Sequence, residues 1–235
     1  MRNHTSGRVA IRHAAIAAVL AISAGCGGKH YLAQYEFSDR TLGLVYIEPP
    51  SPELLHGWYN VDVGNSALQT VVNAGASVAK EVQARRARAR LDSAVASVDI
   101  SGRLAQRTLE RASRYLGTRP VETAQGADYV LEIHMRRFGL DARSNNAAYL
   151  FTRAEAVLLD RKTGREIWSE EVHGTDRMTP FVVGTATVPS AVFTAATLHM
   201  VSVAEFEQAL DQLVTYTSNL ITEELRDKLR DVRDR

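Results

Sequence analysis

The sequence predicts an α+β fold in which helices cover one face of a mostly antiparallel sheet of about four strands. Two patterns lead to this prediction. Apolar residues recur every three or four positions in three stretches, which is typical of helices. Three consecutive stretches alternate apolar and polar residues and are joined by polar turns, which is typical of antiparallel strands. The expected order is β-α-α-β-β-β-α, and the last helix is long.

The first residues of the chain predict export. Arg2, Arg8 and Arg12 come without any acidic residue, and an apolar run follows over residues 14–24. That run is shorter than the about 20 apolar residues that a membrane-spanning helix needs. A basic start, a short apolar run and small residues at its end are typical of a secretory signal peptide. We therefore expect residues 1–25 to be removed.

Cys26, the only cysteine of the chain, directly follows this segment. The residues Ile22-Ser23-Ala24-Gly25-Cys26 resemble a bacterial lipobox, with Ser23 where the commonest form has leucine. The resemblance implies that Cys26 becomes the new N-terminus and is acylated, for example with palmitate. Gly27 follows where an inner-membrane lipoprotein would carry aspartate, and this resemblance implies the periplasmic face of the outer membrane. Without a second cysteine the chain forms no internal disulfide.

The mature chain is close to neutral and large enough for one sizeable core. Removal of the three arginines leaves 25 basic against 27 acidic residues, a net charge near −2. Nothing in this balance indicates a nucleic-acid partner. We expect residues 26–40 to form a lipidated tether and residues 41–235 to form a single periplasmic domain. That domain carries an uncharged insertion at about 178–204.

The first half of the domain reads as one strand and two helices. Thr41–Pro50 is a short apolar strand stopped by two prolines, and Ser51–Asn65 is expected to be a loop. Ser66–Ala96 is rich in alanine and arginine with apolar residues at helical spacing. Ser101–Gly117 predicts a second helix, which Gly117 ends because glycine adopts the left-handed conformation easily.

The second half reads as an antiparallel meander followed by a helix. The alternation in Ala127–Phe138 shifts at Arg136 and Arg137, which predicts a β-bulge. Short turns then connect the strands Ala147–Asp160 and Arg165–Gly174. The helix from Val203 to about Val232 presents one apolar stripe.

Three of these segments together carry a resemblance to a known group of proteins. They are the strand that ends in prolines, the "GADYVLEI" strand after a helix, and "AVLLDRKTGREIWSEEV". They resemble the periplasmic domains of curli-secretion lipoproteins, of lipoprotein activators of penicillin-binding proteins and of the N-terminal domain of the TolB type. The auxiliary lipoproteins of lipid-transporting ABC systems are a looser match. The resemblance implies docking to other envelope components.

No pattern of catalytic or metal-binding residues stands out. The histidines after residue 25 lack the spacing of metal ligands, and no serine lies in a G-x-S-x-G motif. Glu132 and His134 share one strand face, as do Asp128 and Arg136, and we interpret this as a solvated sheet face. We therefore expect no enzyme activity, no cofactor and no metal.

Two segments are candidates for binding a partner. The first is the arginine-rich helix segment, which would suit an acidic partner, anionic lipid or peptidoglycan carboxylates. The second is the uncharged insertion, whose apolar side chains mark a partner or membrane site if they are exposed. The candidate residues are Arg85, Arg86, Arg88, Arg90, Phe181, Val183 and Phe193.

The sequence thus predicts a non-catalytic outer-membrane lipoprotein that docks onto, or helps to assemble, other envelope components. Tethering supports weak docking because confinement raises the effective concentration. One alternative is a subunit of an oligomeric outer-membrane secretion channel, with residues 178–204 supplying barrel hairpins. The other is an auxiliary lipoprotein of an ABC-type lipid transport system.

Overall fold

A computed structural model describes residues 31–56, 82, 85–142, 148–177 and 200–234. The predicted signal peptide, Cys26 and the insertion residues Phe181, Val183 and Phe193 lie outside these ranges. Within them, none of the helices combines the length and apolar character that crossing a bilayer requires.

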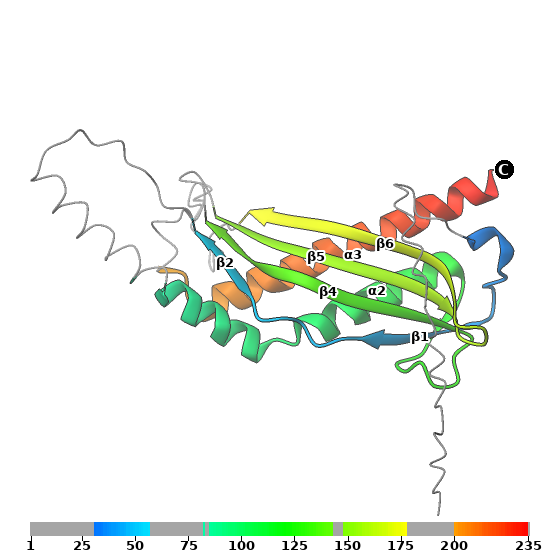
Figure 1. Cartoon of the computed structure of the whole chain (residues 1–235), viewed down its shortest axis with the longest axis horizontal. Coiled ribbons are helices and arrows are strands. Elements are labelled where there is room, and N and C mark those ends of the chain that lie inside the picture. Colours follow the sequence, from blue (N-terminus) through cyan, green and yellow to red (C-terminus); the bar gives the residue numbers. More distant parts are fainter. Residues whose placement is uncertain (1–30, 57–81, 83–84, 143–147, 178–199, 235) are drawn as a thin grey trace, which may run out of the picture.

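The described residues form one mixed sheet (Figure 1). Its strands are β1 (Thr41–Tyr46), β2 (Glu53–His56), β3 (Arg119–Pro120), β4 (Tyr129–Ala142), β5 (Tyr149–Asp160) and β6 (Arg165–Arg177). The order across the sheet is β3-β1-β4-β5-β6. β1 pairs in parallel with the first half of β4, and β2 pairs in parallel with its second half.

The antiparallel meander is confirmed, but the prediction of about four mostly antiparallel strands is wrong in part. β4, β5 and β6 pair antiparallel, and the register of β4 shifts between Met135 and Arg137 as the bulge prediction requires. β1, β2 and β3 add parallel pairs, which gives a sheet of six strands. β2 lies inside the segment that we expected to be a loop. β2 and β3 span only four and two residues, too few to show an alternation.

Three described α-helical segments longer than ten residues accompany the sheet. A helix over residues 85–97 precedes α2 (Ile100–Leu116), and α3 (Val203–Arg233) closes the chain. The Asp99 carboxylate accepts a hydrogen bond from the Gly102 N–H and so caps α2. Gly117 ends α2 with a φ of 73°, as expected. Ser202 and Glu205 form a capping box that fixes the start of α3.

The core lies between the sheet and the paired helices α2 and α3, which run side by side on one of its faces (Figure 1). Inward side chains of β4, β5 and β6 meet the apolar faces of both helices. Trp168, Phe138 and Phe206 are the largest side chains that are almost fully buried. Burying such side chains contributes most of the favourable free energy of folding.

Residues 31–40, which we expected to belong to the tether, pack on the domain. The short helix η1 (Leu32–Gln34) buries Leu32 to 2% exposure. The Tyr31 N–H donates a 2.7 Å hydrogen bond to the Ile167 carbonyl in β6. Phe37 contacts Tyr129 with ring centroids 4.9 Å apart. The chain from Tyr31 onward is therefore part of the folded domain.

Candidate functional site: the charged face of the sheet

The face of the sheet that points away from α2 and α3 carries most of the ionisable side chains of the strands. Successive residues of a strand point to opposite faces, so burying one set against the helices exposes the other. We call the exposed set the charged face. It consists of Glu53, Glu132, His134, Arg136, Arg137, Arg153, Glu155, Glu171 and His173.

Two arginines at the bulge of β4 bind carboxylates on the two neighbouring strands. Because the register shifts there, Arg136 and Arg137 are both exposed although they are adjacent in sequence. The guanidinium of Arg137 donates from Nε at 2.8 Å and from Nη2 at 2.6 Å to the two oxygens of Glu53 in β2. Arg136 binds Glu155 of β5, with Nε 3.0 Å from Oε2. These pairs link three strands.

A second group of ion pairs joins β5 to β6. Arg153 donates from Nε to Oε1 of Glu171 at 2.8 Å, and Nε2 of His173 lies 3.2 Å from the same oxygen. The hydrogen bond from Arg153 lowers the pKa of the Glu171 carboxyl and raises the pKa of the arginine. In the same way, the hydrogen bond from Arg137 lowers the pKa of Glu53. These carboxylates are therefore ionised at neutral pH.

His134 lies between the two groups and is the least exposed ionisable residue of these pairs. Its side chain is 18% exposed, with Nε2 3.8 Å from Glu132 and Nδ1 3.9 Å from Glu155. Nδ1 is buried and has no hydrogen-bond partner among the described residues. The predicted grouping of Glu132 with His134 on one strand face is therefore correct, and β5 adds Glu155 to it.

A shallow depression lies on this face over the second half of β4, the first half of β5 and the second half of β6. Its lining includes Arg137, Phe151, Arg153, His173 and Thr175, and its volume is about 140 Å³. This is smaller than the about 300 Å³ and upward of usual ligand pockets. The register sets Arg137 directly opposite Arg153. The depression thus offers guanidinium donors and one aromatic ring to an acidic or polar side chain of a partner.

Among the described residues, no group of three or more His, Cys, Asp or Glu side chains has the geometry to hold a metal ion.

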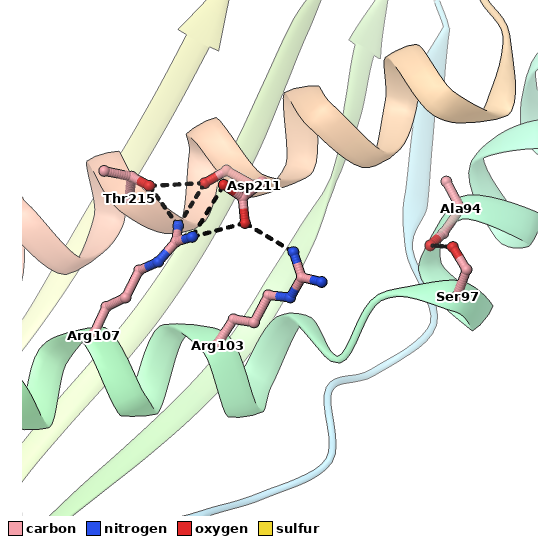
Figure 2. A network of polar contacts seen from close by, with 6 residues as sticks. All are labelled: Ala94, Ser97, Arg103, Arg107, Asp211 and Thr215. Carbon is pink, nitrogen blue, oxygen red and sulfur yellow. Dashed lines mark hydrogen bonds and ion pairs between the residues drawn. The ribbon is translucent and has the colours of Figure 1, made fainter.

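A polar network on the other side of the molecule holds the two long helices together (Figure 2). Arg107 of α2 donates to both carboxylate oxygens of Asp211 in α3, at 2.8 and 3.0 Å, and to its backbone carbonyl at 2.9 Å. Arg103 donates to the same carboxylate at 2.9 Å. Partial burial raises the pKa of Asp211, but the hydrogen bonds from the two arginines outweigh it, so the net shift is downward. This network positions α2 and α3 relative to each other.

Two arginines of the arginine-rich segment have partners within the chain. Arg88 is bound to Asp92 one turn later at 2.8 Å, and Nη1 of Arg90 donates a partly buried 2.8 Å hydrogen bond to the Val201 carbonyl. Arg85 and Arg86 are exposed. The structure thus gives Arg88 and Arg90 contacts within the chain, and a partner at this segment stays a prediction.

Sequence reasoning missed the ion-pair network of the charged face. From the sequence we predicted a polar strand face only for Glu132 with His134 and Asp128 with Arg136. The same two-residue spacing of Arg153 with Glu155 and of Glu171 with His173 could have extended it to the other two strands. This spacing does not indicate which charges meet, because the pairs run across strands and depend on register. Glu53 was not predicted to belong to the sheet at all, because the segment that contains β2 was expected to be a loop.

The sequence matches no family model and no curated protein. Similar solved structures include protein XCC0632 from Xanthomonas campestris, of the family DUF330. It has 18% identity and a TM-score of 0.41, covering 82% of this chain and 90% of that one. A protein from Caulobacter crescentus described as a candidate lipoprotein has 18% identity and a TM-score of 0.34, covering 55% and 86%. The lipoprotein GNA1162 from Neisseria meningitidis has 16% identity and a TM-score of 0.24, covering 59% and 83%.

Of these three proteins, one is described as a lipoprotein and one as a candidate lipoprotein. At this low similarity we draw no conclusion from them about partners or activity.

Proposed function

We propose that the protein is a non-catalytic lipoprotein of the outer membrane that docks another envelope protein on its charged face. The lipobox-like segment that ends at Cys26 supports the anchor. One observation supports the docking role more than any other. The described helices cover one face of the sheet, whereas the opposite face presents paired charges around a shallow depression.

The chemistry of this face suits a polar protein partner. Its arginines are already held by carboxylates, so they meet a partner with little loss of side-chain freedom. Charge patterns of this kind favour specificity and association rate more than affinity. Weak docking is sufficient for a tethered protein, since confinement to one membrane raises the effective concentration.

Site-specific photo-crosslinking in intact cells tests this proposal. A photoreactive amino acid replaces Val157, on the charged face opposite Glu132, or Gln212, on the exposed side of α3, as the matched control. We expect one discrete adduct with a heterologous envelope protein from position 157 and none from position 212. Adducts from both positions in equal yield would contradict a specific charged-face site.

An exchange of one ion pair separates docking from stability. Arg153→Glu combined with Glu171→Arg keeps the internal pair but inverts the charges that a partner meets. We expect the adduct to be lost while the melting temperature stays close to that of the wild type. If the exchanged protein still forms the adduct, the charges of this face do not select the partner. An adduct between two copies of the chain would instead favour the oligomeric channel.

A further inference from the structure

The packing of residues 31–40 leaves little free chain between the predicted lipid and the folded domain. Five Cα–Cα steps separate Cys26 from Tyr31. Fully extended, these steps span no more than about 18 Å. From Tyr31 onward the chain is fixed to β6 by the 2.7 Å hydrogen bond to Ile167. The acylated residue therefore stays close to one end of the sheet.

That end of the sheet is defined by the pairing of its strands. The last residue of β5, Asp160, lies opposite the first residue of β6, Arg165, and also opposite the first residue of β4, Tyr129. η1 lies here too and contacts α3, close to the C-terminal end of that helix (Figure 1). We call η1 together with the β5–β6 turn over residues 161–164 and Arg165 the anchor end.

The anchor end exposes basic side chains at the place where the chain leads toward the lipid. Arg161, Lys162 and Arg165 are all exposed. The guanidinium carbon of Arg165 lies 4.1 Å from the centroid of the Tyr31 ring, so it is held next to the start of the described chain. The acidic residue of the turn, Asp160, accepts hydrogen bonds from the Lys162 N–H at 2.9 Å and the Thr163 hydroxyl at 2.8 Å.

We infer that the anchor end is a membrane-contacting surface, which binds the anionic headgroups of the bilayer through Arg161, Lys162 and Arg165. This inference rests on the proposed acylation of Cys26. Basic side chains within about 10 Å of a charged surface feel its potential, and a linker this short lets the turn come within that range. The far end of β6 then stands away from the membrane. Thr175 is ten strand positions from Arg165, or about 33 Å.

Two threonines on one hairpin give a matched test of this orientation. Once Cys26 is acylated, an introduced cysteine is the only free thiol of the mature chain. Thr163→Cys labels the anchor end and Thr175→Cys labels the far end of β6, and both positions are exposed. The full lipidated protein is placed in vesicles of phosphatidylethanolamine and phosphatidylglycerol that contain an acceptor dye on a lipid headgroup. Energy transfer from a donor on each thiol is then measured.

We expect severalfold more energy transfer from position 163 than from position 175. Equal transfer from both positions, or more from 175, would overturn the inference. Insertion of 20 flexible Gly/Ser residues after Gly28 should reduce the difference, because such a chain has a typical reach of about 25 Å. A difference that survives the insertion unchanged would show that the short linker is not its cause.

A charge variant tests the headgroup contact separately. Arg161→Glu with Lys162→Glu should lower the transfer from position 163 in these anionic vesicles and leave it unchanged in phosphatidylcholine vesicles. The same loss in both would overturn the anionic-headgroup contact.

Flotation and intact mass distinguish this inference from the proposed function. A chain that carries no acyl mass and does not float with the vesicles overturns both. A chain that is acylated and floats, but shows no difference between the two positions, overturns the orientation alone.

Discussion

Arg107 of α2 binds both the carboxylate and the backbone carbonyl of Asp211 in α3 (Figure 2). This single guanidinium therefore restrains α3 both in rotation about its axis and in translation along that axis. The side chains of Arg107 and Asp211 are 32% and 34% exposed, whereas the arginines of the charged-face pairs are 45–52% exposed, so water screens this pair less than those arginine pairs. A second arginine, Arg103, also binds the Asp211 carboxylate, and its side chain is 48% exposed.

Replacement of Arg107 by methionine should weaken the domain. The variant removes hydrogen bonds to a partly buried carboxylate and leaves that carboxylate with Arg103 alone. We expect the free energy of unfolding to fall by about 1–2 kcal/mol in urea denaturation. The matched variant Arg103→Met should cost less than about 1 kcal/mol, because this pair is more exposed. Equal losses would argue against the special position of Arg107.

Glu170 should destabilise the fold at neutral pH. It lies on the helix side of β6, where burial and the charge of Glu224 raise its pKa above the usual 4.5. A carboxyl whose pKa is raised on folding favours the folded state only while it is protonated, so its cost appears as the pH rises through the folded pKa.

Glu170→Gln should therefore raise the melting temperature at pH 7 and leave it unchanged near pH 4. Solvent screening limits the gain to less than about 1 kcal/mol, or about 2–4 °C. The neighbour Glu171 has a lowered pKa, so Glu171→Gln should have the opposite sign at pH 7. If Glu170→Gln also raises the melting temperature at pH 4, the stabilisation comes from better packing and not from removal of a charge.

Gly139 should be indispensable for the pairing of β2 with β4. A Cβ atom at this position would lie 2.0 Å from the carbonyl oxygen of Glu53, which is backbone and has no room to withdraw without separating the strands. We expect Gly139→Ala to cost about 2 kcal/mol or more in chemical denaturation. Glu53→Gln breaks the exposed pair with Arg137 but keeps the backbone, and it should cost much less than Gly139→Ala because exposed ion pairs contribute little to stability. The prediction fails if the two variants are equally stable.

Two arginines of one helix should differ in their effect on stability. Arg90 donates a partly buried hydrogen bond to Val201 just before α3, whereas Arg86 is exposed. We expect Arg90→Met to lower the free energy of unfolding by about 1–2 kcal/mol. Arg86→Met should change it by less than about 0.5 kcal/mol. A large loss from Arg86→Met would show that the exposed side of this helix also matters for folding.

Periodicity and turn chemistry were sufficient to predict the long elements. α2 was predicted with its cap at Gly117, and α3 with its start at Val203, because capping residues and apolar stripes are local signals. The bulge near Arg136 was predicted because it interrupts a regular alternation. β2 and β3 were missed because a parallel strand of a few residues is stabilised by its neighbour and not by its own pattern.

The sequence by itself thus predicted an export signal and lipid attachment at Cys26, and it determined the faces of the main helices and strands, because each depends on residues close together in the chain. Only the tertiary structure decided which charges meet. Arg137 binds Glu53 across 84 positions of sequence, and Arg107 binds Asp211 across 104. It also decided that the chain from Tyr31 onward packs on β6, which shortens the predicted linker. Contacts of this range depend on register and packing, which no local pattern specifies.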